Sequence, residues 1–316
     1  MTPRPVVAVA NATGFLGSAV ARALLNDPQQ AHRVRALVRL PASPQARALA
    51  DAGAEVVATE MEDSHSVLRA LRGSHALFAV TDYWDHGAPE RELAQARAMS
   101  TAASLADVEH VIWSTQEDSR AWMSLDDARM PTLLQRYKVP SSDAKGEADA
   151  FFAASGIPVT LLRTAMAWEQ LLAFGMGPRR AEDGALRLAL PLGDRSLPGI
   201  AVADIGAIVR RLLADGPPSS TRTLGVAAAH LTGRQMALAF QRAVHESVVY
   251  DAVSFASWRS LGIPGADALG NLFQFIHDFN TDHVAARSVD TARALYPALQ
   301  DFDAWLATHR AYIPAI

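Results

Sequence analysis

PVVAVANATGFLG, residues 5–17, carries the strongest structural signal in the chain. The apolar run from Pro5 to Ala10 is short and continuous, which is typical of a strand buried on both faces. A glycine-containing turn follows, and the good helix formers from Phe15 to Leu25 then have helical spacing. Asn26, Asp27 and Pro28 end that helix. This part of the chain is therefore predicted to form a strand, a tight turn and a helix.

The turn at residues 11–17 matches a variant of the glycine fingerprint of dinucleotide-binding domains. Gly14 and Gly17 stand where the backbone approaches a pyrophosphate and where the helix meets the strand. Asn11 replaces the first glycine, and asparagine tolerates the left-handed backbone of such a turn. The N–H groups and positive dipole end of the helix would face phosphate. The alternative is a strand-to-helix turn without a ligand. The predicted contacts are Asn11, Thr13, Gly14, Phe15, Leu16 and Gly17.

Strand and helix continue to alternate after this unit. The predicted strands span residues 33–38, 54–58, 76–81 and 110–114, and the predicted helices span 43–52, 64–71 and 90–106. The crossovers are long enough for parallel pairing with right-handed connections. This pattern predicts an α/β fold with a doubly wound parallel Rossmann sheet.

The second half of the chain is less regular. A helix at about 142–154, a strand at 159–163, a helix at 202–213 and a strand at 222–226 are predicted, and the last ninety residues or so are mostly helical. We therefore expect a Rossmann domain at residues 1–160. Residues 161–316 should form a smaller, mostly helical substrate-side domain, with about 200–228 returning to the first.

The composition excludes several classes of protein. Half of the 316 residues are apolar, which is ample for a packed core, and the formal charge of −4 gives no basic face for nucleic acid. The absence of cysteine excludes disulfides and thiolate metal sites and suits a reducing compartment. No signal peptide and no apolar run long enough to cross a membrane is recognisable. We expect a soluble protein of the cytoplasm.

The end of the second predicted strand indicates which dinucleotide is bound. NAD-binding domains often place an acidic residue there for the ribose hydroxyls, whereas this chain has Val38-Arg39. A guanidinium at Arg39 can clamp a 2′-phosphate, so we predict NADP(H); the alternative is a surface arginine. Asp63 follows the third strand and suits the adenine end, although a helix N-terminal acid explains it equally well.

With these features the chain resembles the NmrA-like family, an atypical branch of the short-chain dehydrogenases. The likeness runs over nearly the whole length, in short pieces that include Ala12-Thr13-Gly14-x-x-Gly17, Val38-Arg39, Thr81-Asp82-Tyr83-Trp84, Lys145-Gly146-Glu147 and Asn271-Leu272-Phe273. The resemblance implies a small C-terminal domain and NADP(H) in a cleft, with Arg39 on the phosphate and Lys145 as the cleft lysine. Some family members are regulators that bind a partner protein, and others reduce quinones, azo compounds or phenylpropanoid-like substrates.

Lys145 is the main candidate for a catalytic group. The chain has only two lysines, Lys138 and Lys145, so each is a candidate for a special role, with chance from GC-rich coding as the alternative. Short-chain dehydrogenases pair a tyrosine with a lysine four positions later on one helix face, and that position is Ser141 here. Ser141 and Ser142 follow Pro140 and resemble helix caps, and Tyr137 is eight residues away. Lys145 is thus either a solvated helix lysine or a ribose-binding acid.

Aromatic residues complete the predicted site. Thr81 ends the fourth predicted strand and is a further predicted cofactor contact. Tyr83 and Trp84 follow that strand at the carboxyl edge, where such sheets bind ligands, and Tyr83 is a second catalytic candidate. Trp84, Trp168 and Phe273 are candidates for the substrate cleft, with loop or core packing as the alternative for each. His277 and His283 do not converge on a helix, so no metal is predicted.

These features favour an NADP(H)-binding protein of one of two kinds. The first is an NADPH-dependent reductase of a small aromatic or conjugated carbonyl, quinone or imine. The second is a non-catalytic redox sensor that regulates a protein partner, which the missing tyrosine of the Tyr-x-x-x-Lys pair favours. We expect a small-molecule substrate or a regulatory partner, no direct contact with nucleic acid or membrane, and a homodimer as one possible assembly.

Overall fold

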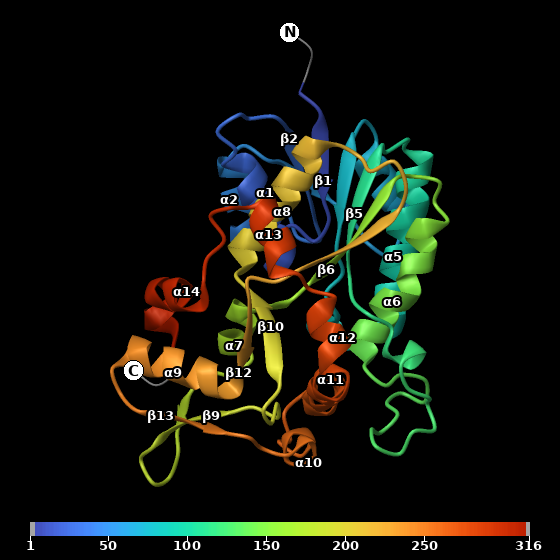
Figure 1. Ribbon diagram of the computed structural model, residues 1–316. Coiled ribbons are helices and arrows are strands. Elements are labelled where there is room, and N and C mark those ends of the chain that lie inside the picture. Colours follow the sequence, from blue (N-terminus) through green and yellow to red (C-terminus); the bar gives the residue numbers. More distant parts are fainter. Residues whose placement is uncertain (1–3, 314–316) are drawn as a thin grey trace. The chain divides into compact units, whose positions relative to one another are not determined.

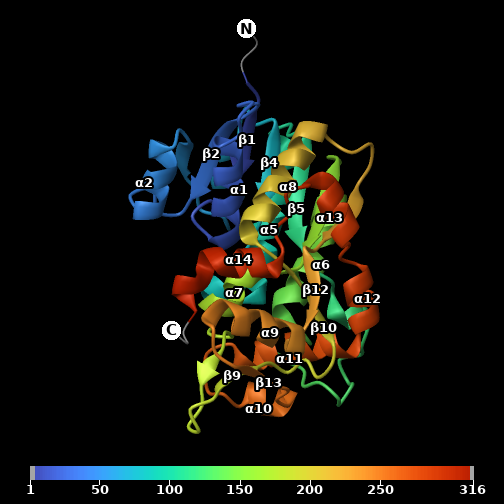
Figure 2. The ribbon, with the colours of Figure 1, turned by 60° about the vertical axis from the view of Figure 1, so that its left-hand side comes forward.

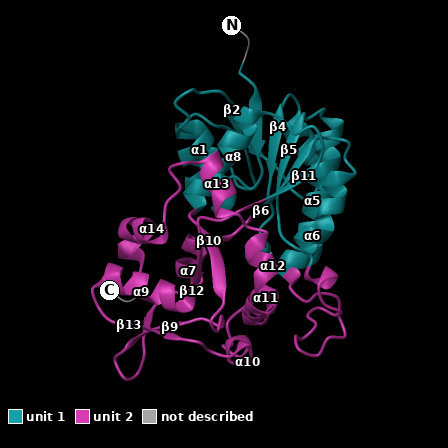
Figure 3. Ribbon diagram, viewed as in Figure 1, with its two compact units in different colours: residues 1–118, 141–163, 202–224 teal, residues 119–140, 164–201, 225–316 magenta. Residues whose placement is uncertain are grey.

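The computed structural model (Figures 1 and 2) describes residues 4–313. Its chain forms two compact units, coloured separately in Figure 3. Unit 1 comprises residues 1–118, 141–163 and 202–224, and unit 2 comprises residues 119–140, 164–201 and 225–316. Each unit is therefore assembled from segments that are far apart in the sequence.

Unit 1 is built on a seven-stranded sheet with the strand order β11-β6-β5-β4-β1-β2-β3. The strands are β1 (Val6–Val9), β2 (Arg33–Val38), β3 (Glu55–Ala58), β4 (Ala76–Ala79), β5 (His110–Thr115), β6 (Val159–Thr164) and β11 (Arg222–Val226). From β3 to β6 all neighbouring strands pair in parallel, which confirms the predicted doubly wound sheet. The order reverses between β1 and β4, and such a switch point is where open α/β sheets bind ligands.

Helices cover both faces of this sheet. They are α1 (Phe15–Leu25), α2 (Pro44–Asp51), α3 (Ser64–Leu71), α4 (Tyr83–His86), α5 (Pro89–Leu105), α6 (Pro140–Ala153) and α8 (Val202–Asp215). α1 and α8 lie side by side on one face, and α5 and α6 lie on the other (Figures 1 and 2). Gly206 permits the close approach of α8, because a Cβ there would lie 2.6 Å from the carbonyl oxygen of Ala19 in α1.

The core of unit 1 follows from the alternation of side chains along the strands. Residues two apart, such as Leu77 and Ala79 in β4 or Val111 and Trp113 in β5, belong to one buried cluster with apolar residues of α3, α5 and α6. The other strand positions face α1 and α8, so each central strand is apolar on both sides. A sheet covered in this way leaves its carboxyl edge for polar side chains.

Unit 2 contains two small sheets and most of the C-terminal helices. One sheet has the order β12-β10-β7 and the other β13-β9-β8. The strands are β7 (Met166–Ala167), β8 (Arg179–Arg180), β9 (Leu186–Ala189), β10 (Ser196–Ile200), β12 (Ala229–Thr232) and β13 (Val248–Asp251). The helices are α7 (Trp168–Ala173), α9 (Gly233–Val244), α10 (Phe255–Arg259), α11 (Ala266–Asp278), α12 (Asn280–Ala285), α13 (Val289–Leu295) and α14 (Phe302–His309), with one-turn helices at Ser119–Ala121 and Arg310–Tyr312. The predicted mostly helical C-terminal region is confirmed.

The segment 119–140 of unit 2 is held by buried polar contacts. Lys138 is fully buried, and its Nζ donates hydrogen bonds to the carbonyl oxygens of Asp127 at 2.9 Å and Met130 at 2.7 Å. From α11, the Asn271 amide donates to the carbonyl oxygen of Pro131 at 2.8 Å. None of the helices in residues 4–313 has the length and hydropathy that a membrane span requires.

Candidate functional site

The turn between β1 and α1 has the geometry of a phosphate cradle. Asn11 has a left-handed φ of 46°, and its carbonyl oxygen accepts a hydrogen bond from the Gly14 N–H at 2.8 Å. A Cβ on Gly17 would lie 2.2 Å from that same carbonyl oxygen, and a Cβ on Gly14 would lie 2.5 Å from the Asn11 side chain. The backbone is therefore folded back so tightly that Gly17 must be glycine, whereas a side chain at Gly14 would first have to displace the Asn11 side chain.

The start of α1 suits a negatively charged group. Gly14 is the N-cap, no side chain caps the helix, and the first turn contains no acidic residue. Backbone N–H groups and the positive end of the helix dipole are thus available to a phosphate. The tight turn and the uncapped helix fit the pyrophosphate of a dinucleotide. Phe15 is exposed, Leu16 is half-buried and Gly17 is buried beneath the turn.

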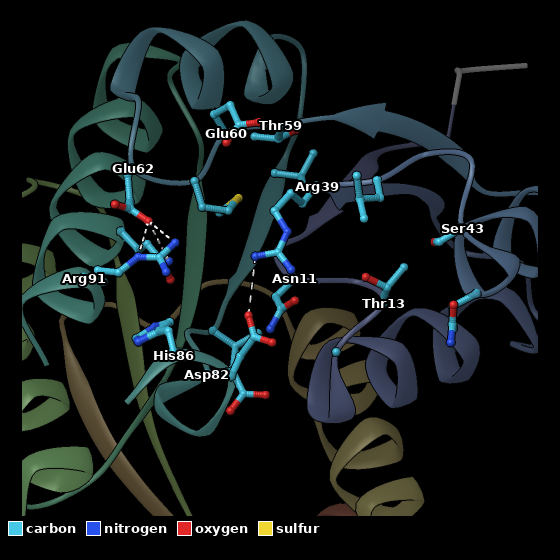
Figure 4. Close-up of a pocket in the computed structure, with 18 residues that line it drawn as sticks. Asn11, Thr13, Arg39, Ser43, Thr59, Glu60, Glu62, Asp82, His86 and Arg91 are labelled. Atoms are coloured by element: carbon cyan, nitrogen blue, oxygen red, sulfur yellow. Dashed lines mark hydrogen bonds and ion pairs between the residues drawn. The ribbon is translucent and has the colours of Figure 1, made fainter. Parts of the chain in front are cut away.

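A cavity of about 320 Å³ lies next to this turn, entirely within unit 1 (Figure 4). It is lined from the segments that follow β1, β2, β3 and β4, so it occupies the carboxyl edge of the sheet at the switch point. Its volume is at the lower end of the range for small-molecule sites, about 300–1,000 Å³, and suits the adenosine end of a dinucleotide. The lining residues are Asn11, Thr13, Gly14, Leu37, Arg39, Leu40, Ser43, Gln45, Thr59, Glu60, Met61, Glu62, Val80, Asp82, Asp85, His86, Arg91 and Gln95.

Two ion pairs cross this cavity. Arg39 Nη1 lies 3.5 Å from Asp85 Oδ2, and Arg91 binds Glu62 with a shortest distance of 2.7 Å (Figure 4). The hydrogen bond from Arg91 lowers the pKa of Glu62, so Arg91 faces an ionised partner at neutral pH. The cavity therefore contains cationic side chains that an anionic ligand can reach, each already opposed by a carboxylate.

Four of the predicted cofactor residues line this cavity together: Asn11, Thr13, Gly14 and Arg39. Asp63 does not line it; its carboxylate caps α3 by accepting from the His65 N–H at 2.9 Å. That contact is the alternative that the sequence left open for Asp63.

Sequence reasoning missed the other polar lining residues. Ser43, Gln45, Thr59, Glu60, Glu62, Asp85, His86, Arg91 and Gln95 were not predicted. Most of them follow a predicted strand within a few residues, which is the signal that could have found them. Burial lowers the pKa of His86 and nearby Arg91 lowers it further, although neighbouring acids oppose this, so its imidazole is neutral near pH 7.

Lys145 lies at a second polar cluster of the same sheet edge. Its Nζ donates to the carbonyl oxygen of Thr81 at 2.9 Å and to the Thr81 hydroxyl at 2.7 Å. The same Nζ lies 3.3 Å from Oε1 of Glu92 in α5, and the Lys145 side chain is only 13% exposed. Thr81 stands between Val80 and Asp82, which both line the cavity. The structure thus brings together the predicted residues Thr81 and Lys145.

One turn further along α6 is a carboxyl group that sequence reasoning did not single out. Asp149 Oδ1 accepts hydrogen bonds from the Thr115 hydroxyl at 2.5 Å and from Trp113 Nε1 at 2.9 Å. Burial raises the pKa of Asp149 to about 6, although both hydrogen bonds favour the ionised form. Asp149 is therefore a group that titrates near neutral pH beside Lys145.

The aromatic candidates lie in different surroundings. Tyr83 is 6% exposed, and Trp84 lies edge-on to it with ring centroids 5.1 Å apart. In unit 2, Trp168 is 2% exposed and packs against Phe302 at 5.1 Å. Phe273 is fully buried and packs against Trp258, 5.4 Å between centroids. Their burial favours core packing, the alternative that the sequence left open for Trp168 and Phe273.

The position four residues before Lys145 is enclosed. Ser141 and Ser142 lie in the first turn of α6, which begins at Pro140, and they are 7% and 5% exposed. Tyr137 precedes the helix and is 1% exposed, with Arg120 and Arg136 over its ring. α6 therefore presents no tyrosine beside Lys145.

The chain is similar to known proteins over almost its whole length. The sequence model of the NmrA-like family matches residues 3–306. The NmrA-like family domain-containing oxidoreductase FrzB of Cladobotryum sp is 27% identical over 287 residues, 85% of this chain and 83% of that protein.

Solved structures share the fold at lower identity. NmrA, a negative transcriptional regulator solved with NADP, gives a TM-score of 0.74 at 21% identity over 96% of this chain and 94% of that one. NmrA has also been solved with NAD. The triphenylmethane reductase of Citrobacter sp., complexed with NADP(H), gives 0.73 at 20% identity over 96% and 99% of the two chains. Two of these structures contain NADP(H), the cofactor predicted from the sequence, and one contains NAD.

Proposed function

Because the chain belongs to the NmrA-like family, we propose that it binds NADP(H) and reduces a small aromatic or conjugated carbonyl, quinone or imine. The observation that carries this proposal is the Lys145 cluster. A protonated side chain, 13% exposed, is fixed by Thr81 and Glu92 at the sheet edge that also holds the phosphate cradle. Relatives such as FrzB bear the name oxidoreductase, which supports a catalytic role.

The residues of the cavity account for cofactor recognition. The N–H groups at the uncapped start of α1 receive the pyrophosphate, and the Asn11–Gly14 hydrogen bond holds the turn that presents them. Arg39 binds the 2′-phosphate, and the Ser43 hydroxyl at the start of α2 is a second donor in the same cavity. These contacts favour NADP(H), since no acidic residue ends β2.

Lys145 serves as the proton donor of the reaction. When bound, NADPH supplies the hydride that reaches the electrophilic carbon of the substrate, and the proton must then come to the oxygen or nitrogen from the protein or from water. The Lys145 ammonium has three N–H groups, and two of them contact Thr81. The contact with the Thr81 hydroxyl is the one that a ribose or substrate oxygen can replace, because the carbonyl and Glu92 still hold the ammonium in place.

The decay of NADPH absorbance in the presence of quinones, enones, imines and aldehydes tests this proposal. We expect turnover with at least one class, and Lys145→Met should lower kcat by about 10²-fold or more while NADPH still binds. Binding is measured separately by calorimetry. Normal turnover by Lys145→Met would remove Lys145 from the mechanism, and no turnover with any class would contradict the reductase.

A redox sensor is the second candidate. The observation that favours it is Ser141, a buried serine where short-chain dehydrogenases have their tyrosine. A sensor should bind NADP⁺ and NADPH with different affinities and capture a protein partner in only one of these states. Calorimetry with both forms, followed by affinity capture with each, tests this; equal capture in all states would reject it.

A further inference from the structure

The guanidinium proposed to bind the 2′-phosphate already faces a carboxylate. Arg39 Nη1 lies 3.5 Å from Asp85 Oδ2, and the dashed line from Arg39 in Figure 4 marks this ion pair. Both residues line the cavity, and their side chains are 60% and 57% exposed. A phosphate that enters the cavity must therefore share the Arg39 guanidinium with Asp85 or displace the Asp85 carboxylate from it.

Asp85 is held at the cavity wall independently of Arg39. It lies in the single turn of α4, where the Asp82 carboxylate caps the start by accepting from the Trp84 N–H at 3.2 Å. Gly87, with a left-handed φ of 65°, ends the turn, and its N–H donates to the Tyr83 carbonyl oxygen at 2.6 Å. Because the turn is fixed at both ends, the backbone of Asp85 keeps its place when the pair is broken, and its carboxylate stays within reach of Arg39.

Arg91, the other arginine that lines the cavity, is not a free alternative partner for the phosphate. Arg91 is bound to Glu62 through both Nε, at 2.8 Å, and Nη2, at 2.7 Å. A 2′-phosphate thus meets one arginine that is shared with Asp85 and another that is engaged by Glu62. The ribose of NAD(H) carries no 2′-phosphate and does not need Arg39. Competition from Asp85 should therefore weaken the binding of NADP(H) and not that of NAD(H).

We propose that Asp85 is a specificity-determining residue that lowers the preference of this site for NADP(H) over NAD(H) by competing for Arg39. The inference rests on the proposed binding of NADP(H) in this cavity. It assigns opposite effects to two residues of one ion pair: Arg39 raises the affinity for the phosphorylated dinucleotide, and Asp85 limits that gain. The preference for NADP(H) is therefore smaller than Arg39 alone would give.

Calorimetric titration of the full chain with NADP⁺ and NAD⁺ tests the role of Asp85. Asp85→Asn keeps the side-chain shape and removes the charge, and an exposed ion pair contributes little to folding, so the variant should fold normally. We expect the ratio of the two dissociation constants to shift toward NADP⁺ by about three- to tenfold, with the NAD⁺ constant nearly unchanged. Raising the salt concentration should shrink the difference between variant and wild type.

Two further variants make the outcome specific. Glu60→Gln removes a charge from the same cavity at a residue with no ion pair to Arg39, and should change the ratio by less than about twofold. In an Arg39→Gln background, Asp85→Asn should shift the ratio less than it does alone. An unchanged ratio in Asp85→Asn, or an equal shift in both backgrounds, overturns the inference. Failure of the wild type to bind either dinucleotide overturns the proposed function and the inference together.

Discussion

Lys145 Nζ lies 3.3 Å from Oε1 of Glu92, a carboxylate whose side chain is 1% exposed. Neither carboxylate oxygen accepts a hydrogen bond within residues 4–313, so the ammonium is what offsets the buried charge. Lys145→Met should therefore reduce the free energy of unfolding by about 3 kcal/mol, because it leaves Glu92 buried and uncompensated. Glu92→Gln should cost less, since Lys145 keeps its bonds to Thr81.

The double variant separates this explanation from a simple loss of packing. With both charges removed, Glu92→Gln/Lys145→Met should recover part of the stability that Lys145→Met loses, as urea denaturation of the three variants and the wild type would show. Strictly additive losses would mean that the two residues do not act as a pair.

Asp149 should make stability depend on pH. Its pKa of about 6 in the folded protein exceeds the usual 3.8, so the folded state retains a proton that the unfolded chain has released. The contribution of Asp149 to the free energy of unfolding therefore falls as the pH rises from about 4 to about 6, and it stays low above that pH. Relative to Asp149→Asn, the wild type should lose about 1 kcal/mol of stability between about pH 5 and about pH 8.

Asn at this position still accepts hydrogen bonds from Thr115 and Trp113, so the comparison isolates ionisation. Urea denaturation of both proteins at the two pH values is the measurement. Parallel pH dependence in the two proteins would show that Asp149 ionises normally in the fold.

The sequence predicts the fold well where structure depends on local patterns. The strand at 33–38 and the helices at 15–25 and 64–71 match β2, α1 and α3, because apolar periodicity and stop signals determine them. The strand predicted at 76–81 ends at Ala79, since Asp82 caps the short helix α4 that follows. The helix predicted from 142 begins at Pro140, which fits the first turn because its missing N–H has no helical partner to lose.

The candidate site is less accessible to such reasoning. The turn at residues 11–17 and Arg39 belong to one local unit, so their types and spacing indicate their role. The partners of Lys145 come from the segment after β4 and from α5, more than fifty residues away. Asp85 reaches Arg39 only because β4 and β2 lie on either side of β1 in the sheet. No local pattern specifies these pairs.

Replacing Lys138, unlike replacing Lys145, should affect the stability of the protein and not its catalytic activity. It is fully buried in unit 2, where its Nζ donates to two carbonyl oxygens of the segment 119–140. Lys138→Met removes those donors and should lower the free energy of unfolding by about 2–3 kcal/mol, because buried acceptors lose charged partners. The affinity of this variant for NADP⁺ should stay near that of the wild type. Denaturation and calorimetry on one preparation would measure the stability and the affinity, and a weakened affinity at unchanged stability would contradict the structural role.

Asn11→Gly should leave the fold intact and change the affinity for NADP⁺ modestly. Glycine adopts the φ of 46° without strain, so the turn keeps its path, while the side chain against Gly14 is lost. Calorimetry of the variant measures the effect. An unchanged dissociation constant would mean that asparagine at this position is neutral, and a misfolded protein would mean that its side chain holds the turn.

The two glycines of the turn should respond differently to alanine. At Gly17 the added Cβ would lie 2.2 Å from the Asn11 carbonyl oxygen and 2.7 Å from that of Ala10, and neither backbone atom can move without opening the turn. Gly17→Ala should therefore cost about 3 kcal/mol of stability. At Gly14 the nearest atoms belong to the Asn11 side chain, which can rotate away, so Gly14→Ala should fold and bind NADP⁺ more weakly. The double variant Asn11→Gly/Gly14→Ala should regain affinity for NADP⁺ if the displaced Asn11 side chain causes the loss. If the affinity does not recover, the new methyl group itself clashes with the phosphate.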